Sequence, residues 1–167
     1  QIKRDFRKPL IAFTPKKLLR YPKAISTLDE LAKGSFQEVM DDPTVDAKKV
    51  KTVALCSGKI YYDVLEQKEV QGKGDHVALV RLEQIYPFPE AQIEEIIKKY
   101  GEDKNYVWLQ EEPENMGAWT FIMKKTREYK VRFDVVSRPE SGSPASGSPI
   151  SSKLRHKTLI NKLFETK

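Results

Sequence analysis

Short apolar runs alternate with amphipathic helical patterns along most of this chain. The runs lie at residues 52–56, 76–82 and 106–109, and each ends in polar residues that precede a stretch with apolar residues three or four apart. Nearly continuous apolar runs are typical of parallel strands that are buried on both faces, with helices carrying the chain from one strand to the next. The pattern predicts an α/β fold in three layers, with a mostly parallel sheet between helices.

Three further stretches have a clear periodicity. Apolar residues over 93–100 follow helical spacing, whereas apolar and polar residues alternate over 131–135, as in an edge strand with one wetter face. Thr27 and Glu30 fit a capping box that begins another helical pattern, which continues to Val39. These stretches predict two more helices and one more strand.

The composition limits the class of protein. With 39% apolar residues, a chain of 167 residues can bury one core. No apolar run approaches the roughly 20 residues of a membrane span, and the first residues lack the apolar core of a signal peptide. Cys56 is the only cysteine, which excludes a disulfide framework and favours a reducing cytoplasmic compartment. The only histidines are His76 and His156, so a zinc site is not expected.

The net charge of +6 is concentrated at the two ends of the chain. Residues 1–20 carry seven Lys or Arg against one acid, and residues 151–167 carry five against one. Basic ends could hold nucleic acid, but no recognition motif accompanies them, so solvated ends are favoured and no nucleic-acid partner is predicted. The opening resembles a cut from a longer chain: residues 1–20 are predicted to end a preceding domain or form a linker, and residues 21–167 to form the domain.

A tract rich in Ser, Gly and Pro precedes the last helical pattern. Twelve of the sixteen residues over 137–152 are Ser, Gly or Pro, which is typical of a mobile linker or loop. Beyond it, Leu159, Ile160, Leu163 and Phe164 form one apolar face. We therefore predict a loop over 137–152 followed by a final helix.

Polar residues follow each predicted strand. If the strands are parallel, their carboxyl ends meet at one edge of the sheet, where ligands bind in α/β folds. We call this edge the rim. Its members are Ser57 and Lys59, Glu83 and Gln84, Gln110 and Glu111, and Ser137 and Arg138.

The rim has the chemistry of a phosphate site but lacks that of a catalytic one. Ser57-Gly58-Lys59 before a helix offers a hydroxyl, backbone N–H groups and a cation, and Arg138 adds a fork of donors. The alternative is that Lys59 and Arg138 only neutralise nearby carboxylates of Glu83, Glu111 and Glu112. The stretch is not a full P-loop, and no nucleophile with a positioned base is recognisable. Cys56, inside an apolar run, is predicted to pack in the core.

Four blocks of sequence identify a resemblance. RKPLIAFTPKKLLRYP, CSGKIYYDV, VRLEQIYPFP and VWLQEEPENMGAW occur in this order. They closely resemble the C-terminal part of the thiamine-diphosphate-dependent decarboxylase, the first component of the 2-oxoglutarate dehydrogenase complex. The resemblance covers nearly the whole chain from Lys8 onwards. It implies a transketolase-like C-terminal domain with a five-stranded, mostly parallel sheet.

The resemblance also implies a role and partners for the domain. The full-length parent would be a bacterial, cytoplasmic homodimer that decarboxylates 2-oxoglutarate in the tricarboxylic acid cycle and transfers the succinyl group to the lipoyl acyltransferase component. Thiamine diphosphate and magnesium would lie in preceding domains, because the GDG motif and substrate histidines of the family are absent here. This chain would carry no catalytic residue, no cofactor and no metal, would not contact a membrane, and would be inactive alone.

Some bacterial members of the family bind acetyl-CoA as an activator at this domain. The positions that match their motifs are Lys8, Ser26, Ser57, Lys59, Gln110 and Arg138. Activated members carry a second basic residue after Arg138, where this chain has Pro139. The alternative to the whole interpretation is a free-standing regulatory module that binds a nucleotide or CoA.

Overall fold

The computed structural model describes residues 5–9, 11–71 and 74–165, and the chain divides into two compact units, residues 1–35 and 36–167. The predicted segment 1–20 therefore lies partly outside the described residues, at positions 1–4 and 10. The first unit contains a 3₁₀ helix, η1 (Lys16–Arg20), and helix α1 (Leu28–Lys33). The second unit begins at Phe36, and the domain start at residue 21 stays a prediction.

The capping box of α1 is present, but the helix is shorter than predicted. The Thr27 amide donates to Glu30 Oε2 at 2.6 Å, and the Glu30 amide donates to Thr27 Oγ1 at 3.2 Å. The helix ends at Gly34 rather than near Val39. The backbone turns so closely there that a Cβ on Gly34 would lie 2.2 Å from the Glu30 carbonyl oxygen. Any other residue would clash with the last turn, which makes glycine the natural end of this helix.

The second unit is built on a five-stranded sheet in the order β1-β3-β2-β4-β5. Strands β2, β3, β4 and β5 are parallel, and the short strand β1 pairs antiparallel with β3. The prediction of an α/β fold with a mostly parallel sheet is confirmed, as is the edge position of the last strand. The strands are β1 (Val39–Met40), β2 (Thr52–Cys56), β3 (Val77–Leu82), β4 (Asn105–Pro113) and β5 (Phe133–Arg138).

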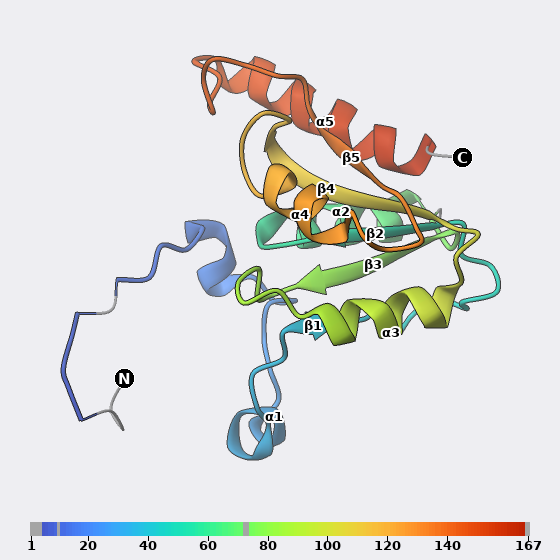
Figure 1. Ribbon diagram of the computed structural model, residues 1–167. Helices are drawn as coiled ribbons and strands as arrows, with labels where there is room; N and C mark the ends of the chain where they lie inside the picture. Colours follow the sequence, from blue (N-terminus) through green and yellow to red (C-terminus); the bar gives the residue numbers. More distant parts are fainter. Residues whose placement is uncertain (1–4, 10, 72–73, 166–167) are drawn as a thin grey trace. The chain divides into compact units, whose positions relative to one another are not determined.

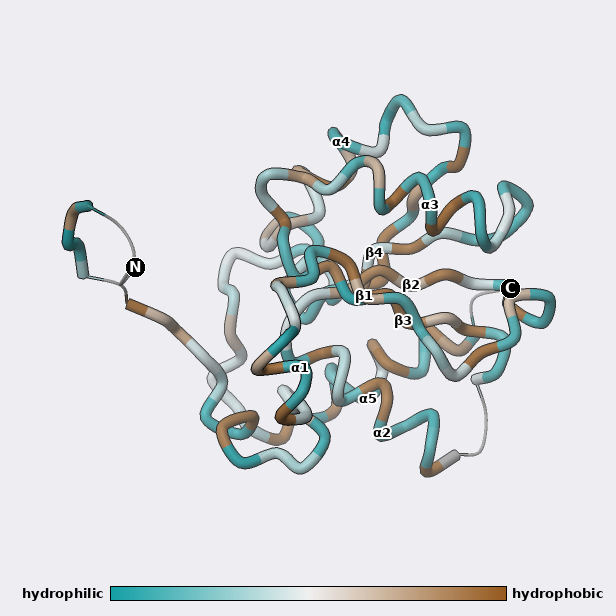
Figure 2. The backbone as a smooth tube through the Cα atoms, turned by 90° about the horizontal axis from the view of Figure 1, so that it is seen from below, coloured by the Kyte–Doolittle hydropathy of each residue, from teal (hydrophilic) through white to brown (hydrophobic). Residues whose placement is uncertain are grey.

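Helices cover both faces of this sheet (Figure 1). They are α2 (Lys59–Gln71), α3 (Glu90–Tyr100), α4 (Trp119–Thr126) and α5 (Pro149–Glu165). Val53, Leu55 and Trp108 pack in one core cluster with residues of α3 and α4. Ala54, Cys56 and Leu109 pack in a second cluster with α2 and α5. Successive strand residues thus enter opposite cores, which explains why the strands are apolar throughout, as the tube coloured by hydropathy shows (Figure 2).

Three boundaries differ from the predictions. Strand β1 was not recognised, because two residues are too few for a periodic pattern. Strand β4 continues through Gln110, Glu111 and Glu112 to Pro113, with a register shift that lets it pair with β5 as far as Arg138. A bulge of this kind accommodates a proline inside a sheet. The tract over 137–152 contributes its first two residues to β5 and its last four to α5, so the connection is 139–148.

Side chains complete the sheet edge where β1 ends. Asp42 Oδ2 accepts a hydrogen bond from the Leu79 amide at 3.1 Å, and Lys68 Nζ donates to the Val77 carbonyl at 2.9 Å. Lys68 also pairs with Asp42 at 3.2 Å. Beyond the two residues of β1, a buried ion pair therefore occupies the place that a longer strand would take, and it satisfies backbone groups that burial would otherwise leave unpaired.

Candidate functional site

The structure brings the predicted rim together. Cys56 of β2 is in register with Arg81 of β3 and Leu109 of β4, so the residues that follow these positions share one edge of the sheet. β5 runs parallel beside β4 and brings Arg138 to the same edge. Four parallel strands with aligned carboxyl ends are the physical basis of the rim.

Lys59, at the start of α2, is held in a charge network. Its ammonium group lies 2.5 Å from Asp63 Oδ2 and 2.7 Å from Glu111 Oε1. Burial opposes the charge of Lys59, but hydrogen bonds to Asp63 and Glu111 outweigh it and raise the pKa above its usual value. The predicted neutralisation of Glu111 is therefore present. Asp63 was missed, although its position four residues after Lys59 on a helix is the spacing of a common ion pair.

His156 of α5 joins the same network. Its Nε2 lies 3.4 Å from Asp63 Oδ2, and its Nδ1 lies 3.7 Å from Glu111 Oε1. Asp63, Glu111 and His156 thus offer three ligand atoms within 4.8 Å of one another. Since the ammonium group of Lys59 contacts both carboxylates, it already supplies the positive charge that a metal ion would bring to them.

Gln110 uses its whole amide within the protein. Its Oε1 accepts from Trp108 Nε1 at 2.8 Å and from the Trp119 amide at 3.1 Å. Its Nε2 donates to the carbonyl oxygens of Pro113 and Met116 at 3.0 and 2.7 Å. With two donors and two acceptor sites all engaged, the buried side chain ties the bulged end of β4 to the start of α4.

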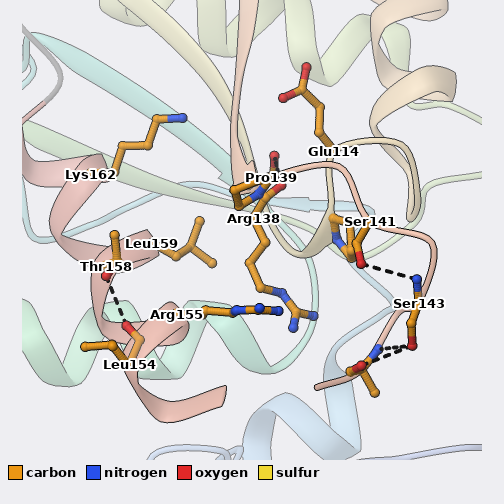
Figure 3. Close-up of a pocket in the computed structure, with 13 residues that line it drawn as sticks. Glu114, Arg138, Pro139, Ser141, Ser143, Leu154, Arg155, Thr158, Leu159 and Lys162 are labelled. Atoms are coloured by element: carbon orange, nitrogen blue, oxygen red, sulfur yellow. Dashed lines mark hydrogen bonds between the residues drawn. The ribbon is translucent and has the colours of Figure 1, made fainter. Parts of the chain in front are cut away.

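Arg138 also contributes structural hydrogen bonds at the rim. Its Nε donates to the Glu111 carbonyl oxygen, and one terminal nitrogen donates to the Pro144 carbonyl oxygen at 3.1 Å. Figure 3 shows its guanidinium group projecting into a cavity beside α5. The predicted pairing of Arg138 with an acidic side chain is thus replaced by bonds to carbonyl oxygens among the described residues.

The remaining rim residues lie in different surroundings. Ser57 lines a cavity of about 380 Å³ that also touches Gln110 and Glu111, whereas Arg138 lines a separate cavity. Glu83 pairs with Arg81 at 2.9 Å, and not with Lys59 or Arg138 as the alternative interpretation had it. Gln84 donates to the Pro87 carbonyl oxygen at 2.9 Å. The rim is therefore divided into two hollows.

Two predicted effector residues belong to the first compact unit. Lys8 and Ser26 are exposed there, and the Lys8 ammonium group lies 5.3 Å from the centre of the Phe6 ring. Only Ser57, Lys59, Gln110 and Arg138 belong to the second unit, and the rim is made by that unit.

Cys56 packs in the core, as predicted. Its side chain is fully buried in the cluster beneath α2 and α5. Burial raises the pKa of the Cys56 thiol to about 12, so the reactive thiolate is not populated at neutral pH. None of the helices in the described parts of the chain is long and apolar enough to cross a membrane.

The fold and rim define a class: a transketolase C-terminal-like α/β domain with polar, largely ion-paired strand ends. The family model described as 2-oxoglutarate dehydrogenase C-terminal matches residues 25–164. The chain belongs to this family, which confirms the resemblance.

Curated relatives agree with the family. The chain is 52% identical over 154 residues to the 2-oxoglutarate dehydrogenase E1 component of Azotobacter vinelandii, with 88% of this chain and 16% of the relative covered. It is 46% identical over 149 residues to the component of that name from Haemophilus influenzae, covering 86% and 16%. It is 42% identical over 167 residues to the 2-oxoadipate dehydrogenase complex component E1 of Mus musculus, covering 98% and 18%. The chain thus spans less than a fifth of the length of these relatives.

Proposed function

We propose that this chain is the C-terminal, non-catalytic domain of the E1 component of a 2-oxoglutarate or 2-oxoadipate dehydrogenase complex. The carrying observation is that a family model for this C-terminal region matches residues 25–164, while relatives with these names extend far beyond the matched part. The contacts at the rim support this role, because Lys59 and the buried amide of Gln110, which could otherwise serve a reaction, are used in ion pairs and hydrogen bonds within the protein.

The full-length protein would use thiamine diphosphate and magnesium in its preceding domains. We propose that it forms a homodimer in the bacterial cytoplasm and passes an acyl group to a lipoyl acyltransferase component. The domain described here would then contribute to assembly and to regulation of that enzyme.

The 167-residue chain alone is expected neither to bind thiamine diphosphate nor to decarboxylate 2-oxoglutarate or 2-oxoadipate. Isothermal titration calorimetry with thiamine diphosphate and magnesium, and an assay for released carbon dioxide, test this. The full-length parent protein, which should bind and react, is the positive control. Micromolar binding of thiamine diphosphate by the short chain would contradict the proposal and favour a free-standing module.

We also propose that the rim holds a phosphate group of acetyl-CoA. The Ser57 hydroxyl and the amides that open α2 would donate hydrogen bonds to it, with Lys59 supplying the charge, and Arg138, which lines the neighbouring cavity, would add a fork of donors. Lys8 and Ser26, in the first unit, stay predicted effector residues. Gln110 would keep the rim in shape rather than contact the ligand, because its hydrogen bonds are all used.

Acetyl-CoA titrations test the rim. Lys59→Ala and Arg138→Ala are each expected to weaken binding about tenfold or more, the effect of losing one charge-assisted hydrogen bond. Lys98→Ala, an exposed lysine of α3, is the matched control and should bind like the wild type. Because Lys59 separates two carboxylates, Lys59→Arg checks that the loss follows the missing charge. Equal affinity in all variants would place acetyl-CoA elsewhere. Absence of binding both here and in the full-length parent would reject the rim as its site.

A further inference from the structure

A hollow beside α5 differs from the rim in its composition. It is a cavity of about 580 Å³ between the end of β5, the connection 139–148 and one face of α5. This volume is in the range of cavities that bind small molecules. Among its lining residues are three cations, Arg138, Arg155 and Lys162, and a single acid, Glu114. The excess of positive charge in a concave site favours an anionic ligand.

The wall of this cavity is held by specific bonds although its sequence is rich in Ser, Gly and Pro. Asn115 Nδ2 donates to the Ser141 carbonyl oxygen, and the Ser141 amide donates back to Asn115 Oδ1, both at 3.1 Å. Arg138 donates to the Pro144 carbonyl oxygen further along the connection at 3.1 Å. The connection is thus attached at two points, so the cavity is formed before any ligand arrives, which lowers the cost of binding.

Arg155 is a cation of this cavity that no described residue engages. It makes no hydrogen bond or ion pair with any residue that the structure describes, whereas Lys59 at the rim is engaged by two carboxylates. Arg138 and Arg155 line the same cavity, and Figure 3 shows both side chains extending from its wall. Two guanidinium groups in the lining of one cavity suit a phosphate group, whose oxygens accept several N–H bonds at once.

Part of the remaining lining is apolar. Leu159 forms part of the buried core at the base of α5, and Leu154 lines the cavity while its side chain remains 65% exposed. Pro113 and Pro139 add further apolar surface without a donor of their own. A ligand with an apolar body would cover Leu154, and a bare inorganic anion would not.

We propose that this cavity binds a phosphate monoester carried on an apolar body. Arg155 and Arg138 would donate to the phosphate, Lys162 would add positive charge, and Leu154 and Leu159 would contact the apolar part. Arg138 is shared with the proposed acetyl-CoA site, but Ser57 and Lys59 do not line this cavity, and Arg155 and Leu154 have no role in that site, so the two proposals are tested separately.

The test uses 1-naphthyl phosphate as the probe in calorimetric titrations of the 167-residue chain at low and high salt. Wild type is expected to bind with a dissociation constant below 1 mM, and affinity should fall at high salt. Arg155→Gln should weaken binding about tenfold, since one charge-assisted contact is lost. Leu154→Ser should also weaken it, whereas inorganic phosphate should bind more weakly than the probe.

Two control variants locate the probe. Lys157→Gln removes an equally exposed charge from α5 without touching the cavity, and Lys59→Ala disables the rim. Both should bind the probe like the wild type, with thermal melting confirming that every variant is folded. Equal losses in Arg155→Gln and Lys157→Gln would reduce the effect to attraction by a basic helix and overturn the proposal. Loss in Lys59→Ala, or no binding by wild type at low salt, would overturn it as well.

Discussion

Replacing Gln110 with alanine is expected to lower the free energy of unfolding by about 3 to 5 kcal/mol. The reason is that this buried amide makes four hydrogen bonds, and truncation leaves Trp108 Nε1 and the Pro113 carbonyl oxygen without their partner. A buried polar group left without a partner costs about 1 to 3 kcal/mol, and the lost volume adds to this. Urea denaturation of wild type and variant at neutral pH measures the change.

Two further variants separate the hydrogen bonds from the change in volume. Gln110→Glu keeps the shape but places a carboxylate against the carbonyl oxygens of Pro113 and Met116, so we expect a comparable loss at neutral pH. The loss should shrink at acidic pH, where the protonated carboxyl group regains one donor. Glu112→Gln, at an exposed neighbouring position, is the control and should change stability by less than about 0.5 kcal/mol. If Gln110→Ala instead lost acetyl-CoA binding at unchanged stability, its role would be in the ligand site.

Asp42→Ala is the second substitution with a large expected effect, about 3 to 5 kcal/mol of unfolding free energy. It would leave the largely buried ammonium group of Lys68 without its carboxylate and the Leu79 amide without its acceptor. Both groups lie at the sheet edge beyond β1, where no strand replaces them. Asp134→Ala is the matched control, because its partner Arg132 and its own side chain are both exposed, and such pairs contribute little.

The effect of Asp42 also depends on pH. Burial by itself would raise the pKa of Asp42, but hydrogen bonds from Thr44 and Leu79 and the charge of Lys68 outweigh it and hold the pKa below its ordinary value. A carboxyl group whose pKa falls on folding stabilises the protein above the unfolded pKa of about 3.9, and this contribution is lost as pH falls through the folded value. The difference in unfolding free energy between wild type and Asp42→Ala should therefore reach its full size at pH 7 and be smaller near pH 3. A difference that does not change between these pH values would refute the assignment.

Gly117 combines a local backbone requirement with a tertiary contact. Gly117 has a φ of 69°, and a Cβ there would lie 2.9 Å from Gln110 Oε1. Gly117 lies just before α4, and the absence of a Cβ lets the backbone come close to another side chain there. That the side chain it approaches is Gln110 depends on the bulge in β4, which no short sequence pattern reports.

Local sequence patterns were enough to predict the architecture of the fold. The apolar runs predicted parallel strands because each of their residues enters a core on one face or the other, and the alternation over 131–135 predicted the edge strand β5. The capping box at Thr27 and the helical face over 93–100 were also correct, since both depend on residues a few positions apart. The four sequence blocks identified the family, which the comparisons confirm.

The roles of particular polar residues were decided only by the tertiary structure. Gln110 was predicted to bind a ligand, yet its amide is engaged by neighbours that a bulge brings near. Asp42 meets Lys68 across 26 positions, and His156 reaches Asp63 from the last helix. Arg155 is a cavity residue only because the connection 139–148 folds back over α5. Burial patterns repeat along a chain and can be read from it, whereas the partners of a buried charge or amide depend on contacts between distant segments and exist only once the layers are packed.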